Sequence, residues 1–309
     1  MKEFKNILLV HDNTESGQFT LSNAIDLASR NQAQLTVIQV IDQIPHDYRM
    51  LITSVTSEEI MNLAIKEQTL LLEKAVAHFP KTPNIKCKVI VGREFIEIIK
   101  EVLQNKRDLV IKTARGMGGT LGMLFGSTAM HLLRKCPCPV WLIKPGQGQQ
   151  FHRIMAAVDV VPLDSSGTAL NTKIMELATA LARVDNGKLH TVHAWDWTSP
   201  DTQLHTHEGP VNILDRIKEM RTGWMEDLLG KCDLQHLAHQ EFVVQGNTAE
   251  VILEHAEQHQ IDLVVMGTLC RTGISGFFIG NTAEKILHRM KCSVLAVKPD
   301  GFISPVLPD

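Results

Sequence analysis

The amino-acid sequence predicts an α/β protein of two tandem domains, each an open, five-stranded parallel sheet with helices on both faces. Three observations predict this fold. The 309 residues suffice for two domains of ordinary size. The two halves of the chain repeat one another in the same order. Within each half, short apolar runs alternate with amphipathic stretches of helical period, which is typical of a parallel sheet.

The repeat is clearest near the end of each half. Residues 126–145 match residues 280–299 without a gap, and the shared residues are Gly, Thr, Ala, Leu, Cys, Val, Lys and Pro. An apolar run followed by an aspartate also occurs twice, at 7–12 and at 154–159. Two copies of one domain explain these matches, because two long units are too few for a solenoid.

A short linker separates the two copies. Residues 146–150 are rich in Gly and Gln and follow a proline, as is typical of a connection between domains. We therefore predict domain 1 over residues 1–146 and domain 2 over residues 151–309.

The first half opens with two strand–helix pairs. Residues 6–10 form a short apolar run, which predicts the first strand, and residues 22–30 have an apolar face of helical period. The β-branched residues of 34–41 predict the second strand. Helical periodicity then extends over 57–79 and stops before Pro80.

The rest of the first half continues this alternation. A third strand is expected at 86–91, after which Gly92 turns the chain into a helix at 94–104, and a fourth strand is expected at 109–112. A glycine-rich loop then leads to the last helix and the last strand, at 127–135 and 139–143.

The second half repeats this order with a longer middle. Its strands are expected near 154–158, 189–194, 241–244, 263–266 and 293–297. In such sheets, ligands bind at the carboxyl ends of the strands, where the strand order reverses. The candidate functional residues are therefore those that follow the first, second and fourth strands of each copy.

Composition excludes several classes of function. The chain has 31 Lys and Arg against 34 Asp and Glu, so it has no basic excess for nucleic-acid phosphates. Aromatic residues make up only 5%, which disfavours a base-stacking platform. Neither a secretory leader nor an apolar run of about 18 residues is present, so we expect a cytoplasmic protein with no membrane span.

A glycine-bearing loop follows the fourth strand of the second copy. It leads from Met266 and Gly267 to a helix that we expect to start at Thr282, with Asn281 as its N-cap. Free backbone N–H groups and the helix dipole make such an entrance suitable for a phosphate. The alternative is a plain strand-to-helix connection whose glycines only make turns. The loop is neither a Walker motif nor a Rossmann fingerprint.

Three short segments of the sequence resemble those of a known family. They are Gly-Asn-Thr-Ala-Glu at 280–284, Gly-Ile-Ser at 273–275 and His-Leu-Leu-Arg-Lys-Cys-Pro at 131–137. With the order of elements, they make essentially the whole chain resemble the universal stress protein family in its tandem form. The resemblance implies Rossmann-like, HUP-type domains with strand order 3-2-1-4-5. It also implies a stress-response protein that binds a small molecule and is not an enzyme.

The resemblance also implies how such proteins assemble. In the family, the fifth strand mediates dimers, so residues 139–143 and 293–297 are expected to pair within the chain. An exposed strand edge favours such pairing. We therefore expect an intramolecular pseudo-dimer, which a homo-oligomer could extend.

The nucleotide-binding members of the family carry Gly-x2-Gly-x9-Gly-Ser/Thr after the fourth strand. The second copy has Cys270 at the second glycine position, and the first copy has Thr113 at the first. A side chain at either position would crowd a triphosphate, because glycine allows the backbone to approach closely. ATP is the cofactor that the resemblance implies. The alternative is a different, partly apolar ligand and no ATP binding.

The remaining positions of the family's ligand site are assigned by the same resemblance. In the first copy they are Asp12, Val40, Gly116, Gly126 and Ser127, and in the second Asp159, Ala194, Met266, Gly267, Gly280, Asn281 and Thr282. The alternative for both aspartates is a turn or helix-cap role. We expect the stronger site in the second copy, because Lys112 replaces an apolar residue in the first.

Other clusters of reactive residues are weaker candidates. Cys136 and Cys138 are close in sequence, but Cys138 recurs as Cys292 in the repeat, which favours core packing. His236 and His239 have a short spacing that chance explains in a chain with 14 histidines. We therefore expect no metal site and no catalytic residue.

Overall fold

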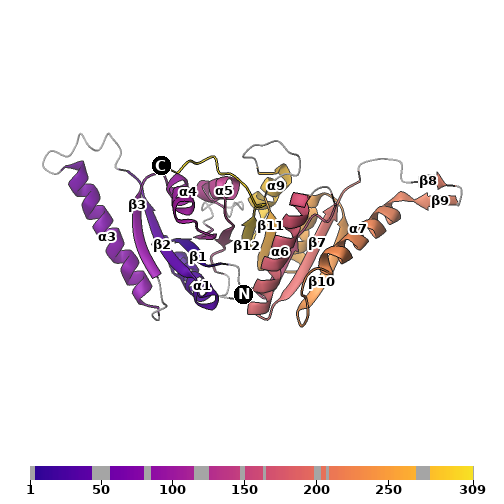
Figure 1. The fold of residues 1–309 in the computed structure, drawn as a ribbon, viewed down its shortest axis with the longest axis horizontal. Coiled ribbons are helices and arrows are strands. Elements are labelled where there is room, and N and C mark those ends of the chain that lie inside the picture. Colours follow the sequence, from indigo (N-terminus) through magenta and orange to yellow (C-terminus); the bar gives the residue numbers. More distant parts are fainter. Residues whose placement is uncertain are drawn as a thin grey trace. The chain divides into compact units, whose positions relative to one another are not determined.

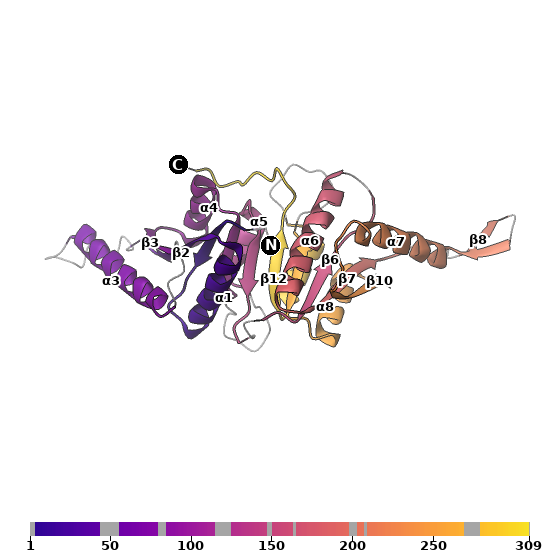
Figure 2. The same ribbon diagram turned by 60° about the horizontal axis from the view of Figure 1, so that its bottom comes forward.

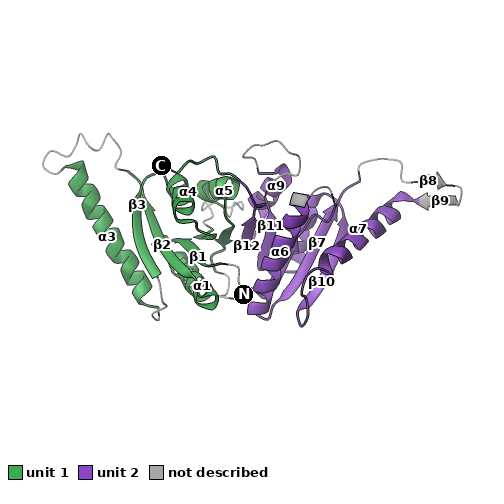
Figure 3. Cartoon of the chain, viewed as in Figure 1, with its two compact units in different colours: residues 1–119, 124–149, 303–309 green, residues 120–123, 150–302 purple. Residues whose placement is uncertain are grey.

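The structure of the chain is a computed structural model. It describes residues 4–43, 56–79, 85–114, 125–146, 150–162, 165–197, 203–206, 209–268 and 279–308. The chain divides into two compact units (Figure 3). Unit 1 comprises residues 1–119, 124–149 and 303–309, and unit 2 comprises residues 120–123 and 150–302.

Unit 1 is an open parallel sheet with the strand order β3-β2-β1-β4-β5. This order is the predicted 3-2-1-4-5. Its elements, labelled in Figure 1, are β1 (Asn6–Val10), α1 (Glu15–Asn31), β2 (Gln34–Ile41), α3 (Ser57–Ala77), β3 (Ile85–Val91), α4 (Glu94–Asn105), β4 (Leu109–Thr113), α5 (Ser127–Lys135) and β5 (Val140–Ile143).

Unit 2 repeats this order as β10-β7-β6-β11-β12, again with parallel neighbours. The antiparallel hairpin of β8 and β9 is inserted after β7. The elements are β6 (Arg153–Ala157), α6 (Ser165–Val184), β7 (Lys188–Trp195), β8 (Gln203–Thr206), β9 (Gly209–Asn212), α7 (Ile213–Leu229), β10 (Ala238–Gln245), α8 (Thr248–Gln258), β11 (Leu263–Gly267), α9 (Asn281–Arg289) and β12 (Ser293–Val297).

Helices cover both faces of the sheet in unit 1, as predicted. Figure 2 shows α1 on one face and α4 and α5 on the other. The chain builds β1 to β3 in one direction across the sheet and β4 and β5 in the other. Because crossovers between parallel strands are right-handed, this reversal places the later helices on the opposite face. Among the described residues, no helix is long and apolar enough to cross a membrane.

Helix α1 begins seven residues earlier than the sequence predicts. Thr14 caps it by accepting a hydrogen bond from the Gly17 N–H at 3.1 Å. The first turns are polar, so the apolar period that reveals the helix starts only later. Gly17 lets the helix lie tightly against the end of β1, because a Cβ there would stand 2.1 Å from the Asp12 carbonyl oxygen.

Candidate functional site

In unit 1, the predicted residues meet at the carboxyl ends of β1, β2 and β4. Asp12, Val40, Gly126 and Ser127 all line one pocket of about 460 Å³. The pocket lies at the switch point between β1 and β4, where open α/β sheets bind ligands. Gly116, the fifth predicted residue of this copy, lies outside the described residues.

Asp12 has a structural role in the turn after β1, which was the alternative to a ligand contact. It is 7% exposed, and its Oδ1 accepts hydrogen bonds from the Thr14 hydroxyl and, at 3.3 Å, from the Thr14 N–H. Since Thr14 in turn caps α1, Asp12 fixes the loop that forms one wall of the pocket. A ligand contact by Asp12 stays a prediction.

His11 is a pocket residue that the sequence analysis did not single out. It is the first residue after β1, is 4% exposed and lines the pocket. Among the described residues, neither of its ring nitrogens has a hydrogen-bond partner. Burial lowers the pKa of His11, and the neighbouring Asp12 charge opposes this shift only in part. A neutral, buried and unpaired imidazole is costly unless another group completes its hydrogen bonds.

Lys112 brings a buried ammonium group to the same pocket. It is 6% exposed, and its Nζ lies 2.7 Å from Glu94 Oε1. The other carboxylate oxygen of Glu94 accepts a hydrogen bond from the Thr128 hydroxyl at 2.6 Å. Glu94 therefore bridges the ends of β4 and α5, and an anionic ligand must compete with it for Lys112 and for the start of α5.

The side chain of Thr113 is turned toward α1. It is 1% exposed, and its hydroxyl lies 3.0 Å from the hydroxyl of Thr20. Thr113 also lines the pocket, so the expectation that this side chain crowds a bound phosphate stays a prediction. Glu94, which lines the same pocket, is the negatively charged group that opposes an anion there.

In unit 2, Asp159 lies at the end of β6, as predicted. Its side chain is 51% exposed, and its Oδ1 stands 3.7 Å from His193 Nδ1. Its backbone is fixed by Asn171, whose Oδ1 accepts from the Asp159 N–H at 3.1 Å and whose Nδ2 donates to the Asp159 carbonyl at 2.6 Å. The aspartate is thus held in place by α6, with its carboxylate accessible.

Buried His193 and half-buried Arg221 form a pair beside Asp159. The Arg221 guanidinium donates to His193 Nε2 at 3.0 Å, and His193 Nδ1 donates to the Val158 carbonyl at 3.2 Å. Because arginine only donates and a carbonyl only accepts, this imidazole is neutral with its proton on Nδ1. Burial lowers the pKa of His193 to about 4, although the bond to Val158 opposes the shift.

Packing against α6 explains why residue 267 is a glycine, and the sequence alone does not reveal this. A Cβ on this residue would stand 2.9 Å from Leu170 Cδ2 and 3.8 Å from Ile174 Cδ1, both on α6. Glycine here lets α6 approach β11. Any further role at a ligand stays a prediction, because residues 269–278, including Cys270, lie outside the described residues. Met266 is 3% exposed, and Ala194 is half-buried near the end of β7.

Gly280, and not Asn281, is the N-cap of α9, so this prediction is wrong. The Gly280 N–H donates to the Thr268 carbonyl at 3.0 Å, which fixes the chain one residue before the predicted cap. Asn281 and Thr282 are the exposed first residues of the helix. Gly126 caps α5 in the same way. Neither glycine offers a side-chain acceptor, so the first N–H groups of both helices need another one.

Comparison with known sequences agrees with the repeat. The model of the universal stress protein family matches residues 3–144 and again residues 150–298. Universal stress protein E of Escherichia coli K12 is 30% identical, over 99% of this chain and 98% of its own length. Universal stress protein E of Photorhabdus laumondii is 27% identical, over the same shares of the two chains.

Solved structures with the same tandem fold cover nearly the whole chain. Protein PA1789 of Pseudomonas aeruginosa PAO1 superposes with a TM-score of 0.70 at 22% identity, covering 96% of this chain and 93% of that one. A universal stress protein of Archaeoglobus fulgidus gives a TM-score of 0.60 at 19% identity, covering 95% and 98%. At these identities the likeness extends to the fold.

Proposed function

We propose that this chain, which belongs to the universal stress protein family and carries two of its domains in tandem, is a regulatory protein that acts by binding a small molecule. Its part in the stress response follows from the family. We further propose that it acts in the cytoplasm and by binding instead of catalysis. An adenine nucleotide is the ligand that we favour.

The observation that carries this proposal is the buried, unpartnered His11 in the pocket of unit 1. A side chain that is 4% exposed normally has its ring nitrogens paired. Both nitrogens of His11 are buried and lack a partner among the described residues, and the residue lines a pocket within the usual size range of ligand sites. A ligand with hydrogen-bonding groups would satisfy the ring once it turns toward the pocket.

The chemistry of the pocket suits a ligand with a polar ring and an anionic group. His11 and Asp12 lie at the ends of β1, where they can pair with the edge of a base or with a ribose hydroxyl. The ammonium of Lys112 and the uncapped start of α5 at Gly126 favour negative charge. An adenine nucleotide carries these groups in one molecule.

Unit 2 is the second candidate for the nucleotide site. Its sequence keeps Gly267 and Gly280, its Asp159 carboxylate is accessible, and α9 starts without a side-chain cap. The sequence therefore favours unit 2. We favour unit 1 because its described residues form a pocket that includes an unpaired histidine, while residues 269–278 of unit 2 lie outside the described residues.

Native mass spectrometry of the full chain tests the proposal without assuming the ligand. When ATP or ADP is added in stoichiometric excess, we expect the protein to bind one or two molecules of it. A fatty acid added at the same excess is the control and should remain unbound. Retention of an apolar molecule from the cell, together with no nucleotide adduct, would instead support the alternative of a partly apolar ligand.

A further inference from the structure

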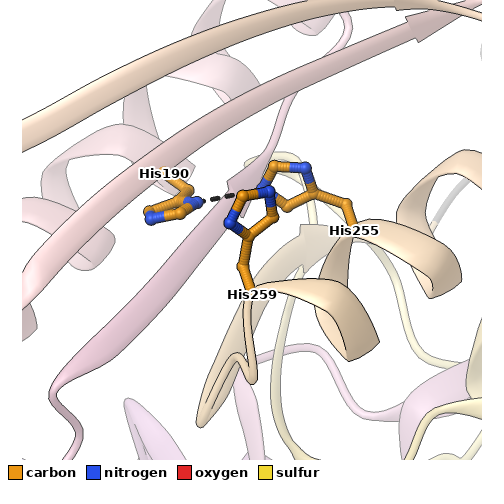
Figure 4. Close-up of side chains that lie close together, drawn as sticks. All are labelled: His190, His255 and His259. Atoms are coloured by element: carbon orange, nitrogen blue, oxygen red, sulfur yellow. Dashed lines mark hydrogen bonds between the residues drawn. The ribbon is translucent and has the colours of Figure 1, made fainter.

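Three histidines of unit 2 meet away from the candidate site. His190 lies on β7, His255 lies on α8, and His259 is the C-cap of that helix. One ring nitrogen from each lies within 4.8 Å of the others. Figure 4 shows the three rings turned toward one another, with His190 approaching from the strand and the other two from the helix.

The fold explains why these side chains converge. His255 and His259 are four residues apart, so they share one face of α8. That face packs against β7, on which His190 is 3% exposed. The Phe242 ring on β10 covers the cluster, with its centroid 4.5 Å from that of His255 and 5.2 Å from that of His190. Half-buried His259 forms the side that is open to solvent.

The two buried histidines already contact each other through a hydrogen bond. His190 Nδ1 lies 3.0 Å from His255 Nε2, so one of these nitrogens carries a proton and the other a lone pair. For both to bind a metal, that proton moves to the other nitrogen of its own ring, and no net proton is released.

We propose that His190, His255 and His259 form a binding site for Zn²⁺, with water as the fourth ligand. Imidazole is a preferred zinc ligand, and three protein ligands plus water is the usual open zinc site. Tetrahedral Zn–N bonds of about 2.0–2.1 Å place ligand nitrogens about 3.3 Å apart. The distance from His190 Nδ1 to His255 Nε2 is 3.0 Å, and one ring nitrogen from each of the three histidines lies within 4.8 Å of the others. These distances bracket the required value, so small side-chain rotations are enough to bind the metal.

One nearby group acts against the cation. Lys188 on β7 adds positive potential at His190. We therefore expect an affinity below that of a closed, cysteine-rich structural site. The competing interpretation is that the histidines form a packed core pair with no metal.

Calorimetric titration of Zn²⁺ into the full chain distinguishes the two interpretations. The protein carries no affinity tag and is first stripped with EDTA. His259→Gln removes the most accessible ligand, so folding is expected to survive. The control is His152→Gln, which removes an exposed histidine of the same unit.

We expect one Zn²⁺ per chain for the wild type and for His152→Gln. Binding by His259→Gln should be weaker by about 100-fold or more, since loss of even an outer-shell partner costs about 10–100-fold. With Co²⁺ as the probe, the visible absorption of a tetrahedral site should appear in the control and disappear in His259→Gln. Unchanged Zn²⁺ affinity in His259→Gln, or no stoichiometric binding by the wild type, would overturn the proposal.

Discussion

At the scale of single residues, charge pairing decides what the pocket of unit 1 can bind. Lys112 is buried and would attract an anion, but Glu94 already lies 2.7 Å from its ammonium group. The Glu94 side chain is 37% exposed, but its removal would leave the buried Lys112 charge uncompensated, which is costly. A ligand phosphate can supply the compensation that Glu94 supplies in its absence.

Glu94→Gln should therefore strengthen the binding of an anionic ligand in unit 1. Glutamine keeps a hydrogen bond to Thr128 but removes the negative charge that competes for Lys112. We expect the affinity for ATP to rise about tenfold, which corresponds to about 1.4 kcal/mol. Calorimetry measures this, with Glu97→Gln on the same helix as the control. Equal affinity in both variants would show that the ligand does not reach Lys112.

Buried histidines in unit 2 make stability depend on pH. His193 has a folded-state pKa of about 4, below its ordinary value, so the unfolded chain takes up a proton first as the pH falls. Its stabilising contribution is complete above about pH 6.5 and is lost between about pH 6.5 and 4. His190 and His255 act in the same direction.

We predict that His193→Gln reduces this pH dependence. Glutamine can keep the bonds to Arg221 and Val158 but does not titrate. Urea unfolding in EDTA should show that the loss of stability from pH 7 to pH 5 is smaller in the variant by about 2 kcal/mol. An identical loss in variant and wild type would mean that His193 has the same pKa in the folded and the unfolded protein.

Residue roles were harder to predict than residue positions. Asp12, Val40, Gly126 and Ser127, which the resemblance to the family assigns to the ligand site, line one pocket, and their roles at a ligand stay predictions. The sequence did not reveal His11, since a histidine next to a buried strand has no distinctive spacing. The i, i+4 pair His255 and His259 is visible in the sequence, but nothing there places His190, 65 residues away from His255, beside it.

At the scale of elements, the start of α1 shapes the pocket of unit 1. Thr14 and Asp12 fix the loop between β1 and α1, and Gly17 lets the first turn of the helix rest on that loop. The contact is to backbone, which cannot move away as a flexible side chain can. Small changes in this turn should therefore reach the pocket.

Gly17→Ala should destabilise the protein and displace this loop. The added Cβ would lie 2.1 Å from the Asp12 carbonyl oxygen and 2.5 Å from its Oδ1. We expect a loss of about 1–3 kcal/mol, as is typical of overpacking. The control is Gly223→Ala in α7, where a Cβ meets nothing within 4 Å. It should gain about 0.5–1 kcal/mol from the better helix propensity of alanine. Thermal unfolding of both variants measures this, and equal shifts in the two would contradict it.

The start of α1 was predicted worst, whereas the starts of α3, α4 and α5 agree with the sequence prediction. The bounds of β1, β2 and β12 also agree with it to the residue, because each strand is rich in apolar and β-branched residues. The start of α1 was missed because its first turns are polar and are fixed by Thr14. The N-cap of α9 was missed because the bond from Gly280 to Thr268 links segments that are distant in sequence. The β8–β9 hairpin was not predicted.

At the scale of the whole molecule, the duplication raises the question of how the fifth strands are used. The resemblance to the family predicts that residues 139–143 and 293–297 serve as dimerising edges. A domain 1 produced alone, over residues 1–146, should then self-associate. Size-exclusion chromatography with light scattering should give a dimer of this fragment, and a folded monomer would contradict the prediction.

The same duplication leaves two candidate ligand sites that a pair of variants can separate. His11→Leu removes both ring nitrogens from the pocket of unit 1 at similar volume. Asp159→Ala removes an accessible carboxylate from unit 2. Each variant leaves the other unit as it is, so each serves as the control for the other.

Calorimetric titration of ATP into the full chain and these two variants tests the central claim most directly. If an adenine nucleotide binds in the pocket of unit 1, His11→Leu should lose the heat of binding, and Asp159→Ala should retain it. ATP binding that is unchanged in His11→Leu, or absent from the wild-type chain, would contradict the account.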